Sequence, residues 1–202
     1  MTNLREHWDD VYSSKAPAET SWYAEDHEPS LTLLAPAFDA SERPRVLDIG
    51  GGRSGLASAL ADNGADVDVL DISAAALTQA VAADSRIHAI VADVREWTPE
   101  HRYDAVHDRA VLHFLVDPHD RARYATSVKA ATTPGGLLVI GTFAPDGPEQ
   151  CSGLPVQRSS ADDLATLMGP SWRERERRRH VHRTPWATEQ AFAWVALERL
   201  AD

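Results

Sequence analysis

Short apolar runs alternate with helical patterns from residue 45 to about residue 143, and this alternation constrains the fold more than any other feature. Most of the runs are apolar on both faces, as expected for strands that helices cover on two sides; they are residues 45–49, 67–70, 87–91, 103–107 and 136–142. Strands and helices in this order form βαβ units with parallel strands. The sequence therefore predicts a doubly wound α/β fold with five parallel strands.

Helix signals lie between and ahead of these runs. Residues 54–63 carry small and apolar side chains on a helical period that ends at Gly64, and Ser73 is placed to cap a helix over residues 74–83. Two helices are predicted ahead of the first strand, over residues 4–13 and 29–38. We expect these two helices to cover the carboxyl edge of the sheet.

The last part of the chain breaks the alternation. Residues 160–168 have a helical pattern, and residues 172–182 and 190–200 are two extended segments joined by a turn around Trp186. We expect an antiparallel hairpin that extends the sheet to seven strands. The charged run over residues 173–183 is then a solvated edge strand.

Composition narrows the class of protein. A chain of 202 residues is long enough for one domain, divided here into an N-terminal helical lid (1–40), a cofactor-binding core (45–143) and a substrate loop with the hairpin (144–202). The net charge of -11 argues against nucleic acid as a partner. The single Cys151, the lack of a signal-peptide pattern and the lack of a long apolar stretch predict a cytoplasmic protein with no membrane contact. No Cys and His spacing suggests a metal site.

A glycine-rich turn follows the first predicted strand. Gly50, Gly52 and Gly55 stand between that strand and the next helix, where a ligand can approach bare backbone. These glycines alone also fit a dinucleotide site. Asp48 favours another ligand, because its carboxylate would repel a pyrophosphate and attract a cationic amino-acid group.

Two more aspartates end the next strands. Asp71 lies about twenty residues beyond the glycines, where a carboxylate can bind a ribose diol. Asp93 can accept a hydrogen bond from the adenine amine while Val94 offers its amide to a ring nitrogen. Each aspartate alone could equally cap the turn that follows it. Three of them at successive strand ends favour a nucleoside site.

With these motifs, the sequence resembles the class I S-adenosylmethionine-dependent methyltransferase superfamily. The resemblance runs through LDIGGG (47–52), DIS (71–73), ADV (92–94), YDAVHD (103–108) and PGGLLVI (134–140). It implies S-adenosylmethionine as the cofactor and S-adenosylhomocysteine as the product. It also implies that Gly50 and Gly52 hold the methionine moiety and nearby ribose, that Asp71 with Ile72 binds the ribose, and that Asp93 binds adenine.

The N-terminal segment resembles the opening of thiopurine methyltransferase and of small lysine methyltransferases of the same superfamily. In those proteins aromatic side chains close over the cofactor, which implies such a role for Trp8, Tyr12 and Trp22. Trp8 and Tyr12 are one helical turn apart and share a face. The alternative for both is plain packing of the helix onto the sheet.

Candidates for the acceptor side follow the fourth strand. Asp108 could contact the methionine end of the cofactor or orient a substrate, and Arg109 could pair with Asp108. His113 is a candidate general base, or else a buried helix residue. Cys151 is expected to be inert, and His182 and Trp186 are weaker substrate candidates.

The sequence thus predicts a methyltransferase, monomeric or homodimeric, that acts on a small-molecule nucleophile. The similarity to thiopurine methyltransferase favours a thiol or another soft acceptor, which needs little base catalysis once ionised. The alternatives are a protein lysine methyltransferase and a non-catalytic module that binds S-adenosylmethionine. A nicotinamide-dependent oxidoreductase is disfavoured by Asp48.

Overall fold

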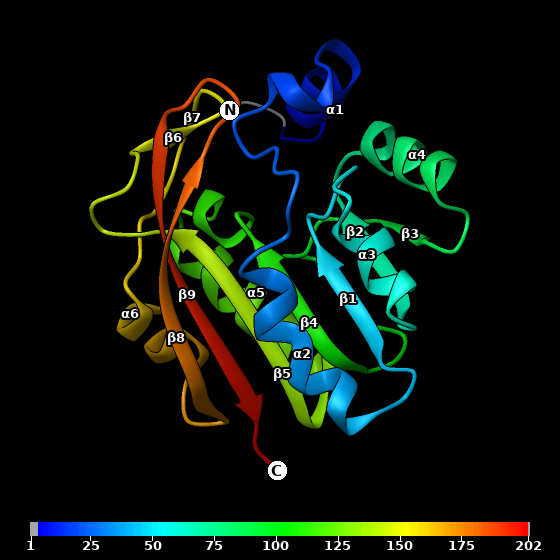
Figure 1. The fold of residues 1–202 in the computed structure, drawn as a ribbon. Helices are drawn as coiled ribbons and strands as arrows, with labels where there is room; N and C mark the ends of the chain where they lie inside the picture. The colour runs from blue at the N-terminus through cyan, green and yellow to red at the C-terminus, as the bar shows by residue number, and fades with distance from the viewer. Residues whose placement is uncertain (1–3, 202) are drawn as a thin grey trace.

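A seven-stranded sheet forms the centre of the protein, for which a computed structural model describes residues 4–201. The strand order is β3-β2-β1-β4-β5-β9-β8 (Figure 1). Five strands are parallel: β1 (Arg45–Ile49), β2 (Asp66–Asp71), β3 (His88–Val91), β4 (Tyr103–Arg109) and β5 (Thr132–Phe143). β9 (Glu189–Arg199) runs antiparallel to β5 and to β8 (Trp172–Arg183). The predicted doubly wound sheet with a C-terminal antiparallel hairpin is confirmed.

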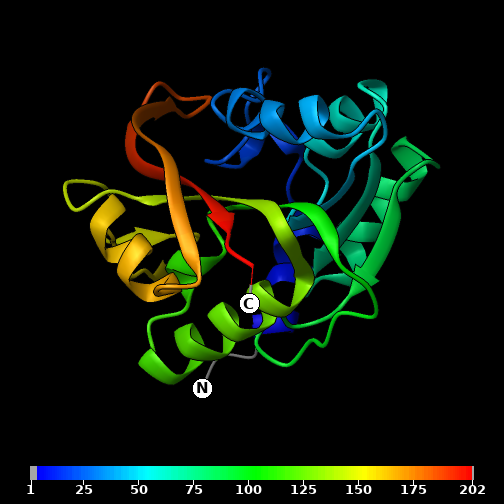
Figure 2. The ribbon, with the colours of Figure 1, turned by 90° about the horizontal axis from the view of Figure 1, so that it is seen from below.

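Helices cover both faces of this sheet (Figure 2). The helices α2 (Ser30–Ala40), α3 (Leu56–Asp62) and α4 (Ala74–Ala83) contribute Leu34, Leu60 and Leu77 to one apolar layer. The helices α5 (Pro118–Ala131) and α6 (Ala161–Met168) contribute Val128 and Leu164 to the layer on the other face. Alternate residues of β5 enter the two layers, as the pleat of a strand covered on both faces requires.

The strand order reverses between β1 and β4, which leaves a crevice at the carboxyl ends of these two strands. Helix α1 (Leu4–Ser14) lies over that end, at the top of Figure 1, and packs against α4. The prediction that α2 would also cover the carboxyl edge is wrong. Its apolar side chains Leu33 and Leu34 are buried against the face of β4 and β5, and only its first turn reaches the crevice.

Local signals explain where several helices begin. The Ser73 hydroxyl accepts a hydrogen bond from the Ala76 amide at 3.1 Å, which confirms the predicted cap of α4. Ser160 and Asp163 form a capping box at the start of α6. Helix α5 was not identified from the sequence, although Asp117 caps it and Pro118 occupies its first turn.

Short elements join the larger ones near the crevice. They are the 3-10 turns η1 (Pro17–Glu19) and η2 (Leu112–Phe114) and the two-stranded hairpin of β6 (Gln150–Cys151) and β7 (Leu154–Pro155). The edge strand β8 exposes most of its charged side chains, many of them in ion pairs such as that of Arg173 with Glu198 at 2.7 Å. Within residues 4–201 no helix has the length and apolar character needed to cross a membrane.

Candidate active site

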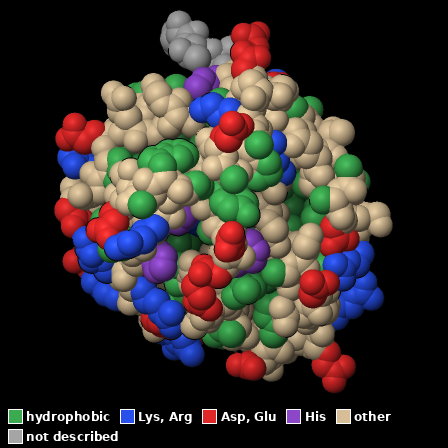
Figure 3. Space-filling model, turned by 45° about the horizontal axis from the view of Figure 1, so that its top comes forward, with side chains coloured by type: hydrophobic (Ala, Val, Ile, Leu, Met, Phe, Trp, Pro, Cys, Tyr) green, Lys and Arg blue, Asp and Glu red, His purple; other side chains and the backbone are tan. Residues whose placement is uncertain are grey.

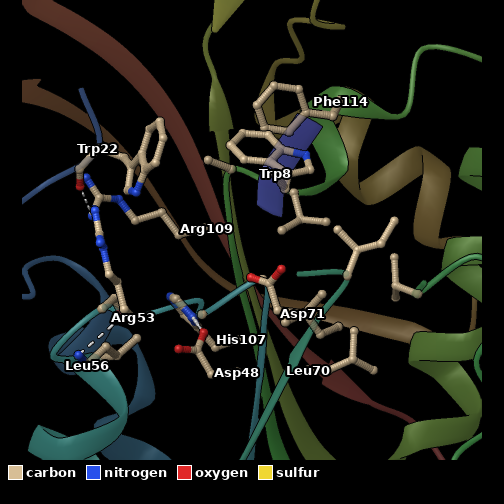
Figure 4. A pocket seen from close by; sticks show the side chains of 18 of the residues that line it. Trp8, Trp22, Asp48, Arg53, Leu56, Leu70, Asp71, His107, Arg109 and Phe114 are labelled. Atoms are coloured by element: carbon tan, nitrogen blue, oxygen red, sulfur yellow. Dashed lines mark hydrogen bonds and ion pairs between the residues drawn. The ribbon is translucent and has the colours of Figure 1, made fainter. Parts of the chain in front are cut away.

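A pocket opens at the carboxyl ends of the parallel strands, beneath α1. Its wall combines the ends of β1, β2 and β4 with the segment that follows β3, the chain between α1 and α2, η2, and Cys151 of the β6–β7 hairpin. Figure 4 shows Asp48, Asp71 and His107 on one side of this space and the rings of Trp8, Trp22 and Phe114 on the other. The crevice created by the strand order is therefore a real cavity with a mixed polar and aromatic lining.

Asp48 lies at the floor of the pocket and is only 2% exposed. Its Oδ1 atom is 2.7 Å from Nδ1 of His107, and Nε2 of His107 is 2.9 Å from the Ser30 hydroxyl. Its other oxygen, Oδ2, is buried against Gly51 and has no hydrogen-bond donor among the residues that the structure describes. A buried carboxylate oxygen in this state is a strong acceptor for a cationic ligand.

Asp71 lies at the end of β2, buried and facing the pocket. Burial raises its pKa to about 6, although the Ser73 amide donates to Oδ1 at 2.8 Å and the nearby Gly52 and Ile72 amides oppose the shift. The carboxylate therefore caps its own turn and still faces the cavity. Ile72, the next residue, also lines the pocket.

Asp93 and Val94 line the part of the pocket beyond β3. Burial acts to raise the pKa of Asp93, but hydrogen bonds from Arg95, with Nε at 2.9 Å from Oδ1, lower it overall. Arg95 also bonds Asp120 on α5 at 2.8 Å. Sequence reasoning missed Arg95, which fixes the orientation of the Asp93 carboxylate.

The two glycines of the turn have positive φ angles, +66° at Gly50 and +53° at Gly52. A Cβ atom on Gly50 would overlap a methyl group of Val111, and one on Gly52 would overlap the Tyr12 hydroxyl. Both positions therefore need glycine for conformation and for space.

Aromatic rings gather over the pocket, as expected for Trp8, Tyr12 and Trp22. The ring of Trp8 lies 6.2 Å from Tyr12, 5.7 Å from Trp22 and 5.1 Å from Phe114, measured between centroids. Phe114 belongs to the candidate segment after the fourth strand, but its contact with Trp8 was not foreseen, because its position in η2 is set by a turn that has no periodic sequence signal. Asp9 anchors α1 in this place by accepting hydrogen bonds from the Ser73 hydroxyl at 2.7 Å and the Ala75 amide at 3.2 Å.

Asp108 and Arg109 have surroundings that differ from those expected from the sequence. Asp108 is fully buried beneath the pocket wall, where it accepts hydrogen bonds from the Val111 amide at 2.9 Å and the Tyr124 hydroxyl at 2.7 Å. It caps the turn after β4, so the expected contact with the cofactor is not supported. Arg109 does not pair with it, since neighbouring strand residues face opposite sides of the sheet. Arg109 lines the pocket instead.

His113 is placed where a general base could not work. Its ring is fully buried between Phe114 and Phe143, with centroids at 4.4 and 4.6 Å, and burial lowers its pKa to about 3. Neither ring nitrogen has a hydrogen-bond partner among residues 4–201. His113 therefore follows the alternative reading, a histidine packed in the core.

Of the remaining candidates, Cys151 and His182 are buried and Trp186 is exposed. Cys151 is buried in the pocket wall, and burial raises the pKa of its thiol to about 11. His182 is buried and its Nε2 lies 2.8 Å from the Ser21 carbonyl oxygen, whereas Trp186 is 55% exposed. Ser30 and His27, which sequence reasoning did not single out, line the pocket because the chain folds back from α1 to α2.

Known proteins share the sequence pattern and the fold. The profile of a family described as a methyltransferase domain matches residues 22–199. A trans-aconitate 2-methyltransferase from Methylobacterium radiotolerans is 32% identical over 124 residues, which are 60% of this chain and 46% of that protein. The chain thus spans less than half the length of this curated relative.

Solved structures extend the likeness to nearly the whole chain. The N-methyltransferase NodS from Bradyrhizobium japonicum, solved with S-adenosyl-L-homocysteine, has a TM-score of 0.75 at 16% identity and covers 98% of this chain and 99% of its own. A 1,6-didemethyltoxoflavin-N1-methyltransferase from Burkholderia thailandensis has a TM-score of 0.67 at 20% identity, covering 98% and 84%. At these identities the likeness shows the shared fold.

The matched profile covers most of the chain, and the strand order, the glycine turn and the pocket agree with it. The chain therefore belongs to the methyltransferase domain family, within the class I S-adenosylmethionine-dependent methyltransferases.

Proposed function

We propose that the protein transfers the methyl group of S-adenosylmethionine to a small molecule bound in the same pocket. The observation that carries the proposal is the buried Oδ2 atom of Asp48, which has no donor among the described residues and lies beside the glycine turn. The α-ammonium group of the cofactor would supply the missing donor and charge. A pyrophosphate at this place would face an unscreened carboxylate, which disfavours a nicotinamide cofactor.

The other polar groups fit the rest of the cofactor. Asp71 would accept hydrogen bonds from the ribose hydroxyls, with Ile72 beside it, and Gly50 and Gly52 leave room for the backbone of the turn to approach the ligand. Asp93 and the Val94 amide would face the adenine ring. The rings of Trp8, Tyr12 and Trp22 would cover the bound molecule and exclude water. Bound there, the cofactor supplies an electrophilic methyl group on a sulfonium.

The acceptor needs no strong base in this pocket. His113 is withdrawn into the core, and both nitrogens of His107 are engaged with Asp48 and Ser30. An acceptor that is already ionised at neutral pH fits this arrangement, as a thiolate or a carboxylate would. The name of the Methylobacterium relative, a trans-aconitate methyltransferase, supports an acceptor of the small-molecule class.

The test is calorimetric titration with S-adenosylmethionine, S-adenosylhomocysteine and NAD. We expect the first two to bind and NAD not to bind. The variant Asp71→Ala should lose binding, whereas Asp66→Ala, at the opposite end of the same strand, should keep it. Binding of NAD alone, or of none of the three, would contradict the proposal.

A further inference from the structure

Arg109 is a half-buried cation in the pocket wall without a matching anion. It is the last residue of β4, and its Nη1 atom donates one long hydrogen bond, 3.3 Å, to the Trp22 carbonyl oxygen (Figure 4). Its guanidinium carbon lies 5.7 Å from the centroid of the Phe192 ring. Within residues 4–201, no carboxylate oxygen is found in ion-pair contact with it.

An Arg109 charge without an anion beside it costs free energy in the protein without ligand. A guanidinium has five N–H donors in a planar fork, and Arg109 uses one of them in the contact just described. Burial lowers the pKa of Arg109, because the charged form loses part of its solvation. A charge that is partly withdrawn from water is normally paired, so a ligand anion would complete the site.

The titratable groups near Arg109, which lines the pocket, include three histidines and two acids. Three histidines are near enough for the charge of Arg109 to act on them, His27, His180 and His182, and burial followed by this charge lowers the pKa of each. Two acids are near enough to feel its charge: Asp48, which is bonded to His107, and Asp26, whose residue is exposed. Figure 3 shows histidine side chains around the hollow on this face, with acidic side chains beside them.

The position of Arg109 assigns it to the acceptor side. The three aspartates proposed to bind the cofactor lie at or just beyond the ends of β1, β2 and β3, whereas Arg109 ends β4 and points toward Trp22 and Phe192 of β9. We propose that the methyl acceptor carries a carboxylate and that Arg109 binds this group through the paired N–H donors of its fork. This inference rests on the proposed methyl transfer and specifies the class of acceptor.

A carboxylate acceptor also agrees with the rest of the pocket. It is ionised at neutral pH, so one of its oxygens can form the bond to the methyl carbon while the bond from that carbon to the sulfonium breaks. The products are the methyl ester and S-adenosylhomocysteine, and no side chain has to remove a proton. The relative from Methylobacterium is named for a substrate with carboxylates, trans-aconitate, which makes that acid a suitable probe.

The experiment measures acceptor binding directly, by calorimetry on protein saturated with S-adenosylhomocysteine. The probes are trans-aconitate, benzoate and cinnamate. Each is compared with the neutral ester in which every carboxylate is methylated. We expect at least one acid to bind while its ester does not. Arg109→Gln should weaken that binding by about 30-fold or more, and Arg109→Lys should restore part of it. With S-adenosylmethionine, any turnover should show the loss as a higher KM.

Two controls separate the possible failures. Arg179→Gln removes an exposed arginine that pairs with Asp146 at 2.6 Å, and it should bind the acid as the unchanged protein does. Titration of S-adenosylhomocysteine into Arg109→Gln shows whether the pocket is still folded. If no acid binds better than its ester, or if Arg109→Gln binds the acid normally, the inference is wrong while methyl transfer stands. Failure of S-adenosylhomocysteine to bind the unchanged protein would instead overturn the proposed function.

Discussion

At the scale of single residues, the pocket contains carboxyl groups whose capacity for hydrogen bonds is only partly used within the protein. Asp48 leaves one buried oxygen without a donor, and Asp71 has its pKa raised to about 6 by burial. Burial disfavours the charged form of Asp71 until a ligand provides donors. The affinity for the cofactor should therefore depend on the charge of Asp71.

The first prediction concerns the pH dependence of cofactor binding. Because the pKa of Asp71 is about 6, the carboxyl group gains a proton as the pH falls through 6 and loses acceptor strength toward the ribose. The Kd of S-adenosylmethionine should rise roughly tenfold between pH 7 and pH 5. Asp71→Asn should bind about 10 to 100 times more weakly at pH 7 and should lose most of this pH dependence.

Calorimetry at several pH values checks this prediction, with Asp66→Asn as the control on the same strand. A Kd of the unchanged protein that stays constant down to pH 5 would show that Asp71 does not titrate in this range or does not contact the cofactor.

Gly50 has to be glycine for its backbone conformation and for the space beside it, and the second prediction measures the two effects separately. Gly50→Ala places a methyl group both at a φ of +66° and against Val111, whereas Gly153→Ala has a similar φ of +75° with open space around the new atom. Each variant should lose about 1 to 2 kcal/mol of stability from backbone strain. Only Gly50→Ala should lose more stability than the backbone strain accounts for, and only this variant should also bind the cofactor more weakly. Urea unfolding and calorimetry measure both effects; equal behaviour of the two variants would contradict the close packing at Gly50.

Which site residues the sequence could predict depends on how local their positions are. Asp48, Asp71 and Asp93 line the pocket as expected, and each lies within two residues of the end of a strand with a clear apolar pattern. The expected contact of Asp108 with the ligand and the expected pairing of Arg109 with Asp108 do not occur in the structure. The strand β4 extends two residues beyond its apolar run, and the pleat turns Arg109 rather than Asp108 toward the pocket. Ser30 and Phe114 reach the pocket through contacts between distant segments, which no local pattern records.

At the scale of elements, α1 is held over the pocket by few contacts. Asp9 accepts hydrogen bonds from the Ser73 hydroxyl and the Ala75 amide at the start of α4, where an acidic side chain also meets the favourable end of the helix dipole. Arg53 adds a hydrogen bond to the Lys15 carbonyl oxygen at 2.5 Å. The position of the aromatic rings over the pocket thus depends on a small polar contact between two helices.

The third prediction tests this contact. Asp9→Ala removes both hydrogen bonds, so α1 should detach more often, trypsin should cut more quickly at Lys15, and S-adenosylmethionine should bind about 5 to 20 times more weakly. Asp9→Asn keeps an acceptor oxygen and should show a smaller change. An unchanged rate of cleavage in Asp9→Ala would mean that other contacts hold α1 in place.

The bounds of helices and strands were predicted correctly where the sequence has a clear apolar run or a clear cap. The strands and α4 follow apolar runs and caps, so their bounds agree with the structure to within a few residues, except for the start of β5. The strand β5 begins at Thr132, four residues before the predicted start. Residues 132–135 include a proline and a glycine, and the pairing of β5 with β4 is irregular there. The helix α5 has little amphipathic character, since polar side chains lie on most of its faces, and its packing on the sheet relies on residues such as Tyr124 and Val128.

At the scale of the whole molecule, buried ionisable groups couple folding to pH. His113 stays neutral in the folded state because burial lowers its pKa to about 3, whereas an unfolded chain protonates it near pH 6.5. The unfolded state therefore binds more protons between these values, and the stability that depends on neutral His113 is lost as the pH falls below 6.5. Asp71 and Asp108, with raised pKa values, act in the opposite direction.

The fourth prediction isolates the contribution of His113. His113→Leu should change the stability by less than about 1.5 kcal/mol at pH 7.5, because the site is apolar and of similar size. As the pH falls from 6.5 to 4.5, the variant should gain on the unchanged protein by up to about 1.4 kcal/mol per pH unit. The effects of Asp71 and Asp108 are present in both proteins and cancel in the comparison.

Urea unfolding at pH 7.5, 6.0 and 4.5 measures this difference, and turnover at pH 7.5 supplies a second readout. The variant should keep its ability to bind S-adenosylmethionine and to transfer methyl groups. Loss of turnover with intact folding and binding would return His113 to the role of a base.

The contact of Trp8 with Trp22 at the mouth of the pocket has a practical consequence. Two of the six indoles of the chain border the pocket, whereas Trp194 is buried against His107 and Trp186 is exposed on the β8–β9 turn. Ultraviolet emission from Trp8 and Trp22 should change when a ligand replaces the water beside their rings. The molecule thus carries its own optical reporter, with which the arrival and departure of the nucleoside can be followed in milliseconds without a label.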